Sequence, residues 1–375
     1  MTILLAPNAM KGSLTAQQCA VILRRSLLRK YPTATIISLP VADGGNGTLE
    51  CLMNALGGTM YEKEVTGPIP SLKVNARYGI TTQHIAIIES AEAIGLQHIT
   101  PSPETIAQST SRGVGELLLA VLKHPLQEIW IGLGGTATND GGAGLARALG
   151  IEILNEYGKE VTEGAVHLTK VSRIDFQLSE VATQIKNRKL KILCDVHNSL
   201  LGNDGATYTF APQKGATEEQ LPYLEAALKN FADIVETTLG KTFRAIPGSG
   251  AAGGLGFGLL AFCNAQRVPG IDFILNAIGF DNYLQQCDFV ITTEGTIDKQ
   301  TLLGKGIFGI TQRAKKFGKP VHAFVGRIQG EKANLQHTLG LASLIQISPD
   351  DLPTPQAMHD ASWLLADAVY HHKFQ

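Results

Sequence analysis

The chain has 375 residues, of which 44% are hydrophobic and 17% are charged, and this composition excludes an intrinsically disordered protein. Since domains average about 150 residues, the length predicts two of them. Lys and Arg number 32 and Asp and Glu number 33, so the net charge of -1 provides no basic excess for binding a nucleic acid.

The location of the protein is predicted from what the sequence lacks. No run of about 18 apolar residues is present, which excludes a transmembrane helix. Residues 1–7 have neither the charged start nor the apolar length of a signal peptide. The five cysteines are widely spaced and form no CxxC pair, so neither disulfides nor a thiolate metal site are indicated. We therefore expect a cytoplasmic protein with no membrane partner.

Short apolar runs alternate with helical patterns along the chain, and this alternation predicts an α/β fold. Most runs are continuously apolar, which is typical of parallel strands buried on both faces. The predicted strands are residues 2–6, 35–40, 85–89, 128–133, 190–194, 288–292, 321–325 and 341–347. The predicted helices are one that follows a Thr15–Gln18 capping box, 111–123, one from Ala143, 218–239, 254–265, 305–317 and 356–371.

Residues 61–90 have a different pattern from the rest. The segments 62–65 and 72–78 alternate polar and apolar residues around a Gly67-Pro68 turn, as half-exposed antiparallel strands do. The two ends of the chain instead resemble βαβ units. We therefore predict one domain built from residues 1–60 and 286–375, with a second α/β domain, residues 61–285, inserted between them.

Two loops near the N-terminus follow predicted strands, where ligands of open α/β sheets bind. Lys11 stands just before the N-terminus of a capped helix, where the helix dipole disfavours a positive charge. The position suits a lysine if an anion lies between the lysine and the helix. A solvent-exposed loop lysine explains it equally well. Asp43 is followed by the glycine-rich stretch 44–47, which suits a metal ion or a hydroxyl, or else a turn that caps a helix.

The segment 131–144 is the strongest candidate site. It places six glycines, two threonines, Asn139 and Asp140 between a buried strand and a helix. Backbone N–H groups and hydroxyls in such a loop form a nest for phosphate oxygens. Because each glycine costs backbone entropy, a loop with a purely structural role is not expected to contain so many.

Two further segments carry charged residues after strands. Asp195 directly follows a strand, the usual place of a catalytic carboxylate, whereas the nearby His197 is more often structural. Lys214 precedes a glycine and could pair with phosphate. Glu294, Asp298 and Lys305 follow a later strand, and their carboxylates suit Mg²⁺ unless they are solvent-exposed loop charges.

Residues 248–253 match GxGxxG, and Asp272 follows at the spacing of a dinucleotide site. However, Pro247 interrupts the strand that such a site needs, and a close-packed helix start explains the glycines equally well. The Gly-Lys-Thr at 240–242 is not a Walker A loop, because Val235 occupies the position of its first glycine.

Together these segments resemble the bacterial glycerate kinase family over nearly the whole chain. The matching motifs lie at 8–14, 42–48, 134–144, 194–198, 210–217, 250–254 and 293–298, and those at 134–144 and 210–217 are long and specific. Three positions depart from the family motifs, since Asn8 and Asn46 replace acids and Thr296 replaces an arginine. These departures are compatible with an altered substrate, weaker metal binding or lower activity.

The resemblance implies ATP-dependent phosphorylation of D-glycerate to 2-phosphoglycerate, with ATP and Mg²⁺ as cofactors. It implies a flavodoxin-like or Rossmann-like domain from both termini, an inserted α/β domain and an active site in the cleft between them. Asp195 would accept the hydroxyl proton, with Lys11 and Asp43 also catalytic. The implied nucleotide ligands are Gly134, Gly135, Thr136, Thr138, Asn139, Asp140, Gly141, Lys214 and Lys305, and the implied metal ligands are Asp43, Glu294 and Asp298.

Three other functions stay open. A kinase for another small hydroxy acid would share the site, and an NAD-binding oxidoreductase would use the 248–253 loop. A catalytically weak regulator would bind glycerate without releasing ADP. The expected partners are small molecules, D-glycerate and ATP, and the sequence leaves a homodimer open.

Overall fold

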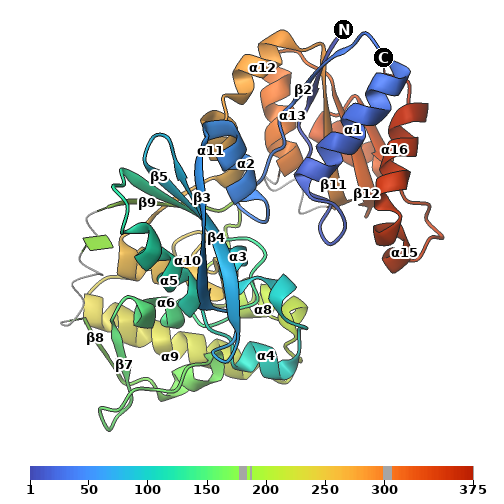
Figure 1. Cartoon of the computed structure of the whole chain (residues 1–375). Helices are drawn as coiled ribbons and strands as arrows, with labels where there is room; N and C mark the ends of the chain where they lie inside the picture. Colours follow the sequence, from blue (N-terminus) through green and yellow to red (C-terminus); the bar gives the residue numbers. More distant parts are fainter. Residues whose placement is uncertain (177–183, 186–187, 299–305, 375) are drawn as a thin grey trace. The chain divides into compact units, whose positions relative to one another are not determined.

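The computed structural model describes residues 1–176, 184–185, 188–298 and 306–374. The chain divides into two compact units, which are described separately (Figure 1). Unit 1 comprises Met1–Asp43, Glu50–Ala55 and Ile271–Gln375, and unit 2 comprises Gly44–Leu49 and Leu56–Gly270. Both termini therefore belong to unit 1, and most of unit 2 is an insertion in its sequence.

Unit 1 contains a five-stranded, fully parallel sheet with the order β13-β12-β11-β1-β2. This is the flavodoxin-like order, in which ligands bind at the carboxyl ends of the first strand and its later neighbour. The strands are β1 (Thr2–Leu5), β2 (Thr35–Ser38), β11 (Phe289–Ile297), β12 (Val321–Ile328) and β13 (Ser343–Gln346). The predicted α/β class with a parallel sheet from both termini is confirmed.

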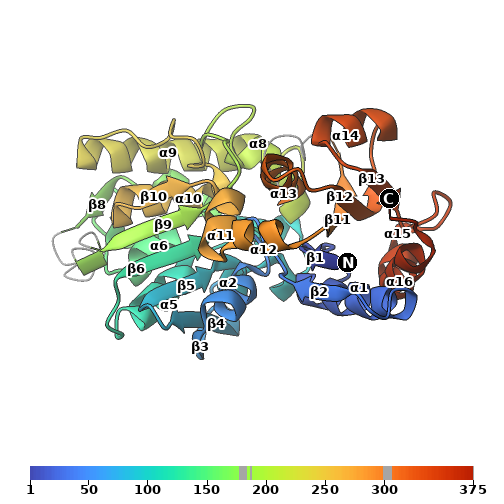
Figure 2. The same ribbon diagram turned by 90° about the horizontal axis from the view of Figure 1, so that it is seen from above.

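Helices cover both faces of this sheet (Figure 2). On one face α1 packs against α16, and Ile3 and Leu5 of β1 join their apolar side chains in one core. On the other face α12 packs against β1, and α13 packs against β11 and α14. The helices of unit 1 are α1 (Ala16–Lys30), α11 (Gly270–Ala277), α12 (Phe280–Gln286), α13 (Gly306–Lys316), α14 (Lys332–Leu339), α15 (Thr354–His359) and α16 (Ala361–His371).

Two details of unit 1 differ from the sequence analysis. The chain returns to this unit at Ile271 rather than at residue 286, because α12 packs against β1 and α11 is joined to α13 through Arg313. The single helix predicted for 356–371 is two helices that meet at Asp360, where the backbone leaves the helical region. The Thr15–Gln18 capping box begins α1 as predicted.

Unit 2 contains a six-stranded mixed sheet with the order β10-β9-β6-β5-β4-β3. The strands β10, β9, β6 and β5 are parallel, and β3 and β4 form the predicted antiparallel pair. The strands are β3 (Gly58–Thr66), β4 (Lys73–Thr81), β5 (Ile85–Glu89), β6 (Glu128–Gly132), β9 (Lys189–Leu193) and β10 (Gln266–Val268), and a small separate pair consists of β7 (Glu152–Leu154) and β8 (Arg173–Asp175).

The helices of unit 2 enclose one large apolar core with this sheet. α5 packs against β3 and α6, and α10 packs against α9 and β9. The helices are α3 (Ser90–Ile94), α4 (Pro103–Ala107), α5 (Arg112–Val121), α6 (Ala143–Ala148), α8 (Ala206–Phe210), α9 (Leu221–Leu239) and α10 (Ala251–Cys263), while α2 (Thr48–Leu56) carries residues of both units. Across the described part of the chain, no helix has the length and apolarity needed to cross a membrane.

Candidate active site

A pocket of about 340 Å³ lies in unit 1, lined by residues that follow β1 and β2 and by the carboxyl ends of β11 and β12. Its charged lining residues are Lys11, Asp43, Glu294, Asp298 and Arg327. Four of these were predicted as site residues, and the structure places them around one cavity. Arg327 was missed, because it lies at the end of an apolar strand with no glycine-rich motif beside it.

Glu294 is the most deeply buried acid of this pocket, with 8% of its surface exposed. Burial and, to a smaller extent, the negative charge of Asp43 raise its pKa to about 7, although the positive charge of Lys11 opposes this change. The Asn8 amide donates a hydrogen bond of 2.9 Å to Glu294 Oε2. The carboxylate therefore sits where a positive charge would stabilise its ionised form.

Asn8 is held in place by Thr293 of β11 and by the adjacent Ala9. Its carbonyl accepts a hydrogen bond of 2.6 Å from the Thr293 hydroxyl, and its side-chain oxygen accepts one of 2.9 Å from Ala9 N. A Cβ at Gly306 would lie 2.7 Å from Asn8 Nδ2, so a glycine at the start of α13 leaves space for this amide. The Asn8 side chain thus presents its donor end to Glu294.

The three predicted metal ligands line the same pocket but do not form a preformed metal centre. Among the described residues, no group of three or more His, Cys, Asp or Glu side chains is arranged to hold a metal ion. Asp43 and Glu294 nevertheless interact electrostatically, as the raised pKa of Glu294 shows. Asp43 and Glu294 are therefore the pair of carboxylates for which the structure shows an interaction.

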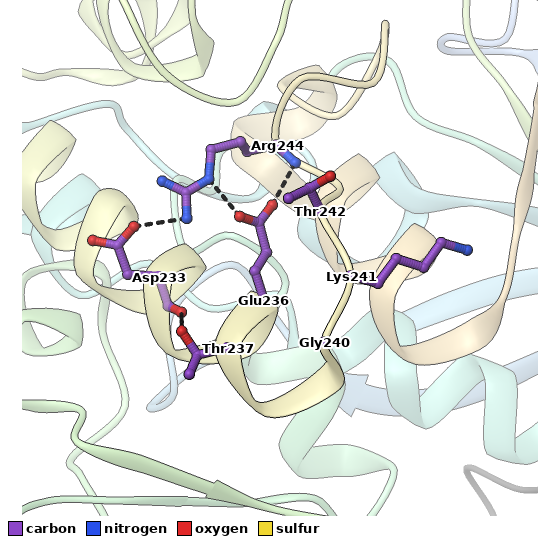
Figure 3. Close-up of a pocket in the computed structure, with 7 residues that line it drawn as sticks. All are labelled: Asp233, Glu236, Thr237, Gly240, Lys241, Thr242 and Arg244. Atoms are coloured by element: carbon purple, nitrogen blue, oxygen red, sulfur yellow. Dashed lines mark hydrogen bonds and ion pairs between the residues drawn. The ribbon is translucent and has the colours of Figure 1, made fainter.

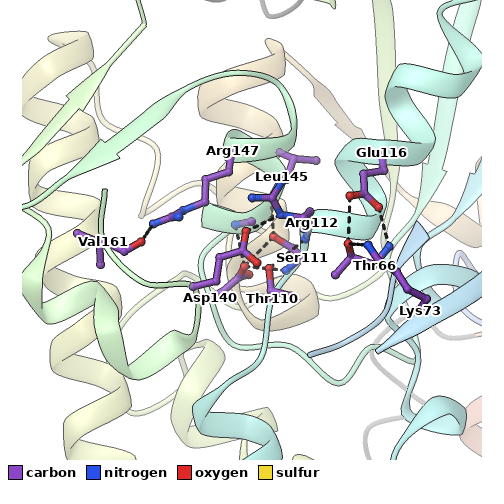
Figure 4. Close-up of polar contacts among 12 residues, drawn as sticks. Thr66, Lys73, Thr110, Ser111, Arg112, Glu116, Asp140, Leu145, Arg147 and Val161 are labelled. Atoms are coloured by element: carbon purple, nitrogen blue, oxygen red, sulfur yellow. Dashed lines mark hydrogen bonds and ion pairs between the residues drawn. The ribbon is translucent and has the colours of Figure 1, made fainter. Parts of the chain in front are cut away.

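In unit 2, Asp140 of the glycine-rich segment lies inside the protein, with 2% of its surface exposed (Figure 4). Its Oδ2 accepts hydrogen bonds from Ser111 N at 2.7 Å, from Ser111 Oγ at 2.8 Å and from Gly144 N at 2.9 Å. Its Oδ1 accepts a further bond from Gly142 N at 3.1 Å. Asp140 thus joins the first turns of α5 and α6, and both of its oxygens are used by protein donors.

The glycines of this segment have a packing role that the sequence analysis did not anticipate. A Cβ on Gly142 would lie 2.7 Å from the Cα atom of Gly258, and one on Gly254 would lie equally close to the Cα atom of Gly141. Glycine at these positions lets the start of α6 touch α10 backbone to backbone. The expectation that a structural loop would not need so many glycines was wrong for this part of the segment.

Lys214 is also enclosed in unit 2, with 2% of its surface exposed. Burial lowers its pKa to about 7, although the charge of Asp140 opposes this change, and its Nζ donates a hydrogen bond of 2.8 Å to Thr138 O. Asn139 Nδ2 donates to Thr207 Oγ1 at 3.3 Å, and Asn139 Oδ1 has no hydrogen-bond partner among the described residues. Lys305, the other predicted nucleotide ligand with a positive charge, lies outside the described residues.

Glu89 is a buried acid that the sequence analysis missed. It ends β5 and has 4% of its surface exposed. Its Oε2 accepts hydrogen bonds from Gly47 N at 3.0 Å and Leu49 N at 3.1 Å, at the start of α2. Burial raises its pKa to about 7. The acid at the end of a predicted strand, the signal used for Asp195, could have identified it.

Asp195 follows β9 by two residues and is partly exposed. His197, whose role was left open, lies with Nε2 3.2 Å from Nη2 of Arg267 on β10. Asp195 and His197 both follow the carboxyl end of β9, a parallel strand of unit 2. This is the edge of a parallel sheet where ligands bind.

The GxGxxG alternative has no structural support as a dinucleotide site. Residues 240–247 form no strand, and a Cβ on Gly250 or Gly253 would overlap the carbonyl oxygens of Ser199 and Thr138. These glycines therefore serve close backbone packing. The alternative of an NAD site in this loop is excluded, because a dinucleotide needs open space beside the glycines.

The Gly-Lys-Thr segment at 240–242 borders an open pocket of about 670 Å³ (Figure 3). Gly240 ends α9 in the left-handed region with φ of 64°, so the segment is a helix C-terminus and not a phosphate loop. Arg244 bridges Asp233 at 2.7 Å and Glu236 at 2.6 Å across this pocket. Asp233, Glu236 and Arg244 thus satisfy one another, while the Lys241 ammonium lies 5.3 Å from the centre of the Phe243 ring.

Comparisons with known proteins identify the family. The model of the glycerate kinase family matches residues 3–372. A glycerate kinase from Halalkalibacterium halodurans is 40% identical over 370 residues, 98% of this chain and 96% of the relative. A glycerate 2-kinase from Escherichia coli K12 is 37% identical over 348 residues, 92% of this chain and 90% of the relative.

The same relationship is seen in three dimensions. A crystal structure described as that of glycerate kinase 2 from Salmonella typhimurium LT2 has a TM-score of 0.79 and 35% sequence identity to this chain. The match covers 99% of this chain and 96% of that one. The similarity in sequence and in structure extends over both units. This chain therefore belongs to the glycerate kinase family.

Proposed function

We propose that this chain phosphorylates D-glycerate with ATP and Mg²⁺ and releases 2-phosphoglycerate and ADP. Relatives named glycerate kinase and glycerate 2-kinase support the reaction and the position of the new phosphate. The observation that carries the proposal is the unit 1 pocket, where Glu294 interacts electrostatically with Asp43 and Lys11. Phosphoryl transfer depends mainly on positioning and charge neutralisation, and this pocket offers fixed charges of both signs.

Asp43 and Glu294 fit the requirements of Mg²⁺. Burial and repulsion by Asp43 keep the pKa of Glu294 high, and a bound cation would offset both. Mg²⁺ usually binds one or two carboxylates together with water and substrate phosphates, so a third acid is not required. These two residues would hold the ion, which when bound neutralises negative charge on the phosphates.

Lys11 and Asp195 complete the proposed catalytic set. Lys11 is an exposed lysine of the unit 1 pocket, and its ammonium group would stabilise charge on the transferred phosphoryl group. Asp195, partly exposed at the carboxyl end of β9, would accept the proton of the glycerate hydroxyl. A single positioned base of this kind contributes about 10²–10⁴-fold to a reaction rate.

In unit 2, the exposed end of the glycine-rich segment is proposed to bind nucleotide phosphates through its backbone. Gly135 and Asn46 are both exposed, and a Cβ on Gly135 would overlap Asn46 Oδ1, so the two loops meet there. The buried Asp140 and Lys214 would then shape the segment from inside. Their partners within the protein argue for this role over direct contact with the nucleotide.

The test is an ADP-release assay with Mg-ATP and D-glycerate, followed by identification of the product by ³¹P NMR. We expect ADP and 2-phosphoglycerate in equal amounts. A panel of other small hydroxy acids serves as the control for substrate identity. ADP release with another acid but not with glycerate, or 3-phosphoglycerate as the only product, would contradict the proposal.

A further inference from the structure

Arg327 is a charged residue of the unit 1 pocket that no motif singled out. It is half-buried and lies on β12 directly beside Thr296 of β11, since the two are register partners in the parallel sheet. Register partners on neighbouring parallel strands project from the same face. The Arg327 side chain and the exposed Thr296 side chain therefore share one side of the pocket.

We propose that Arg327 binds the carboxylate of the acceptor substrate, an assignment that rests on the proposed glycerate phosphorylation. The family motif has an arginine where this chain has Thr296. Arg327 supplies a guanidinium from the neighbouring strand, at the register position beside that residue. The positive charge missing from β11 is thus provided by β12.

Local packing explains how Arg327 is held at this place. A Cβ on the preceding Gly326 would lie 2.5 Å from the Gly295 carbonyl oxygen, so glycine there lets the ends of β11 and β12 approach closely. Arg327 Nη2 donates a hydrogen bond to Leu352 O, on the segment between β13 and α15. This bond uses one of five guanidinium N–H groups and orients the plane of the group.

The charges of the pocket indicate which anion Arg327 takes. Asp43, Glu294 and Asp298 repel any anion that enters, so an anionic ligand needs a positive charge. The phosphates of ATP arrive with a metal ion and have Lys11 as a further partner. The glycerate carboxylate brings no cation of its own, and the planar fork of an arginine matches a carboxylate with two parallel hydrogen bonds.

The test measures steady-state constants of the Arg327→Gln variant. We expect its KM for D-glycerate to rise about 10- to 100-fold, as the loss of a charged hydrogen-bonded pair predicts, with the KM for ATP within twofold of the wild-type value. In the double variant Thr296→Arg/Arg327→Gln, the guanidinium moves to the neighbouring strand, and we expect most of the glycerate affinity to return. A merely structural role for Arg327 would not give this rescue.

Arg24→Gln is the matched control. Arg24 is an exposed arginine of unit 1 that also donates a hydrogen bond to a backbone carbonyl, that of Ile36 at 3.1 Å, but it does not line the pocket. Its removal is expected to change neither KM. The Arg327→Lys variant keeps a positive charge at this position. Thermal unfolding of all the variants, this one included, separates loss of glycerate binding from loss of folding.

Three outcomes would overturn the assignment. An unchanged KM for glycerate in a folded Arg327→Gln variant would exclude the contact. A rise confined to the KM for ATP would assign the residue to phosphate instead. Failure of the double variant to regain affinity would exclude the compensation between β11 and β12. Wild-type protein that does not phosphorylate glycerate would instead contradict the proposed function, so the two failures are distinguishable.

Discussion

The unit 1 pocket and the glycine-rich segment of unit 2 arise from the same kind of sequence, an acid among glycines just after a strand. In unit 1 Glu294 lines a cavity and accepts two hydrogen bonds from the described residues, one from the Asn8 amide and one from Gly295 N. In unit 2 Asp140 accepts four hydrogen bonds and is surrounded by backbone. Burial raises the pKa of both carboxyls, but only Glu294 lines a cavity where a ligand could reach it, whereas Asp140 is committed to the fold.

This difference shows that the number of hydrogen-bond donors around a buried carboxylate distinguishes a candidate ligand-binding residue from one with a structural role. A carboxylate that already accepts four hydrogen bonds has little left to offer a metal ion or a phosphate. A buried carboxylate with few donors pays a desolvation cost that a cation can recover. Substitutions at the unit 1 pocket are therefore expected to change ligand or Mg²⁺ dependence, and a substitution of Asp140 is expected to change the free energy of unfolding.

The largest expected effect is at Asp195, a partly exposed acid in unit 2 that tests whether that unit also contributes catalytic groups. In Asp195→Asn we expect kcat to fall about 10²–10⁴-fold, because a neutral amide cannot accept the hydroxyl proton. The midpoint of thermal unfolding should stay within a few degrees of the wild-type value. Full turnover in this variant would remove Asp195 from the proposed mechanism.

Next in size is Asp140→Asn, which replaces one carboxylate oxygen by an amide that faces N–H donors. We expect the free energy of unfolding in urea to fall by about 2–4 kcal/mol, because buried donors lose their acceptor. The control is Asp367→Asn, an exposed acid of α16, which should change stability by less than about 0.5 kcal/mol. If Asp140 instead bound the nucleotide, the folded variant would show a higher KM for ATP and little loss of stability.

Glu89 resembles Glu294 in donor number, since it is a buried acid that accepts two hydrogen bonds from the described residues. Its pKa of about 7 in the folded protein lies above the ordinary value of 4.5, so ionisation opposes folding as the pH rises through this range. Glu89→Gln keeps an acceptor for Gly47 N and Leu49 N but carries no charge. We expect this variant to match the wild type near pH 4.5 and to exceed its stability by about 1–3 kcal/mol above pH 7. Equal stability at both pH values would contradict the burial argument.

The smallest expected effect comes from Asn8→Asp, which brings a second carboxylate to within hydrogen-bond distance of Glu294. Without Mg²⁺ the variant should lose about 1 kcal/mol of stability through repulsion, and with Mg²⁺ it should regain it. The Mg²⁺ concentration for half-maximal kinase activity should fall severalfold. Measuring unfolding with and without Mg²⁺ separates the repulsion between the carboxylates from the binding of the ion. If neither stability nor activity responds to Mg²⁺ as expected, the metal binds elsewhere.

Sequence reasoning was accurate where the signal is local. The strand at 85–89 was predicted with its observed bounds, and the Thr15–Gln18 capping box begins α1, since strand patterns and caps depend on neighbouring residues. The antiparallel pair β3 and β4 was visible in its alternating pattern. The short strands β7, β8 and β10 and the break at Asp360 were missed, because three-residue elements and kinks depend on distant packing.

The sequence by itself determined the class of fold, which strands are parallel and which form the antiparallel pair, the family, and the residues from which a site could be made. These follow from hydrophobic pattern and from motifs, both of which can be read along the chain. Only the tertiary structure decided that Asp140 and Lys214 face inward while Glu294 and Arg327 line a cavity. Burial and the number of donors around a charge are set by segments far apart in sequence, and those quantities decide whether an acid or a base serves the fold or a ligand.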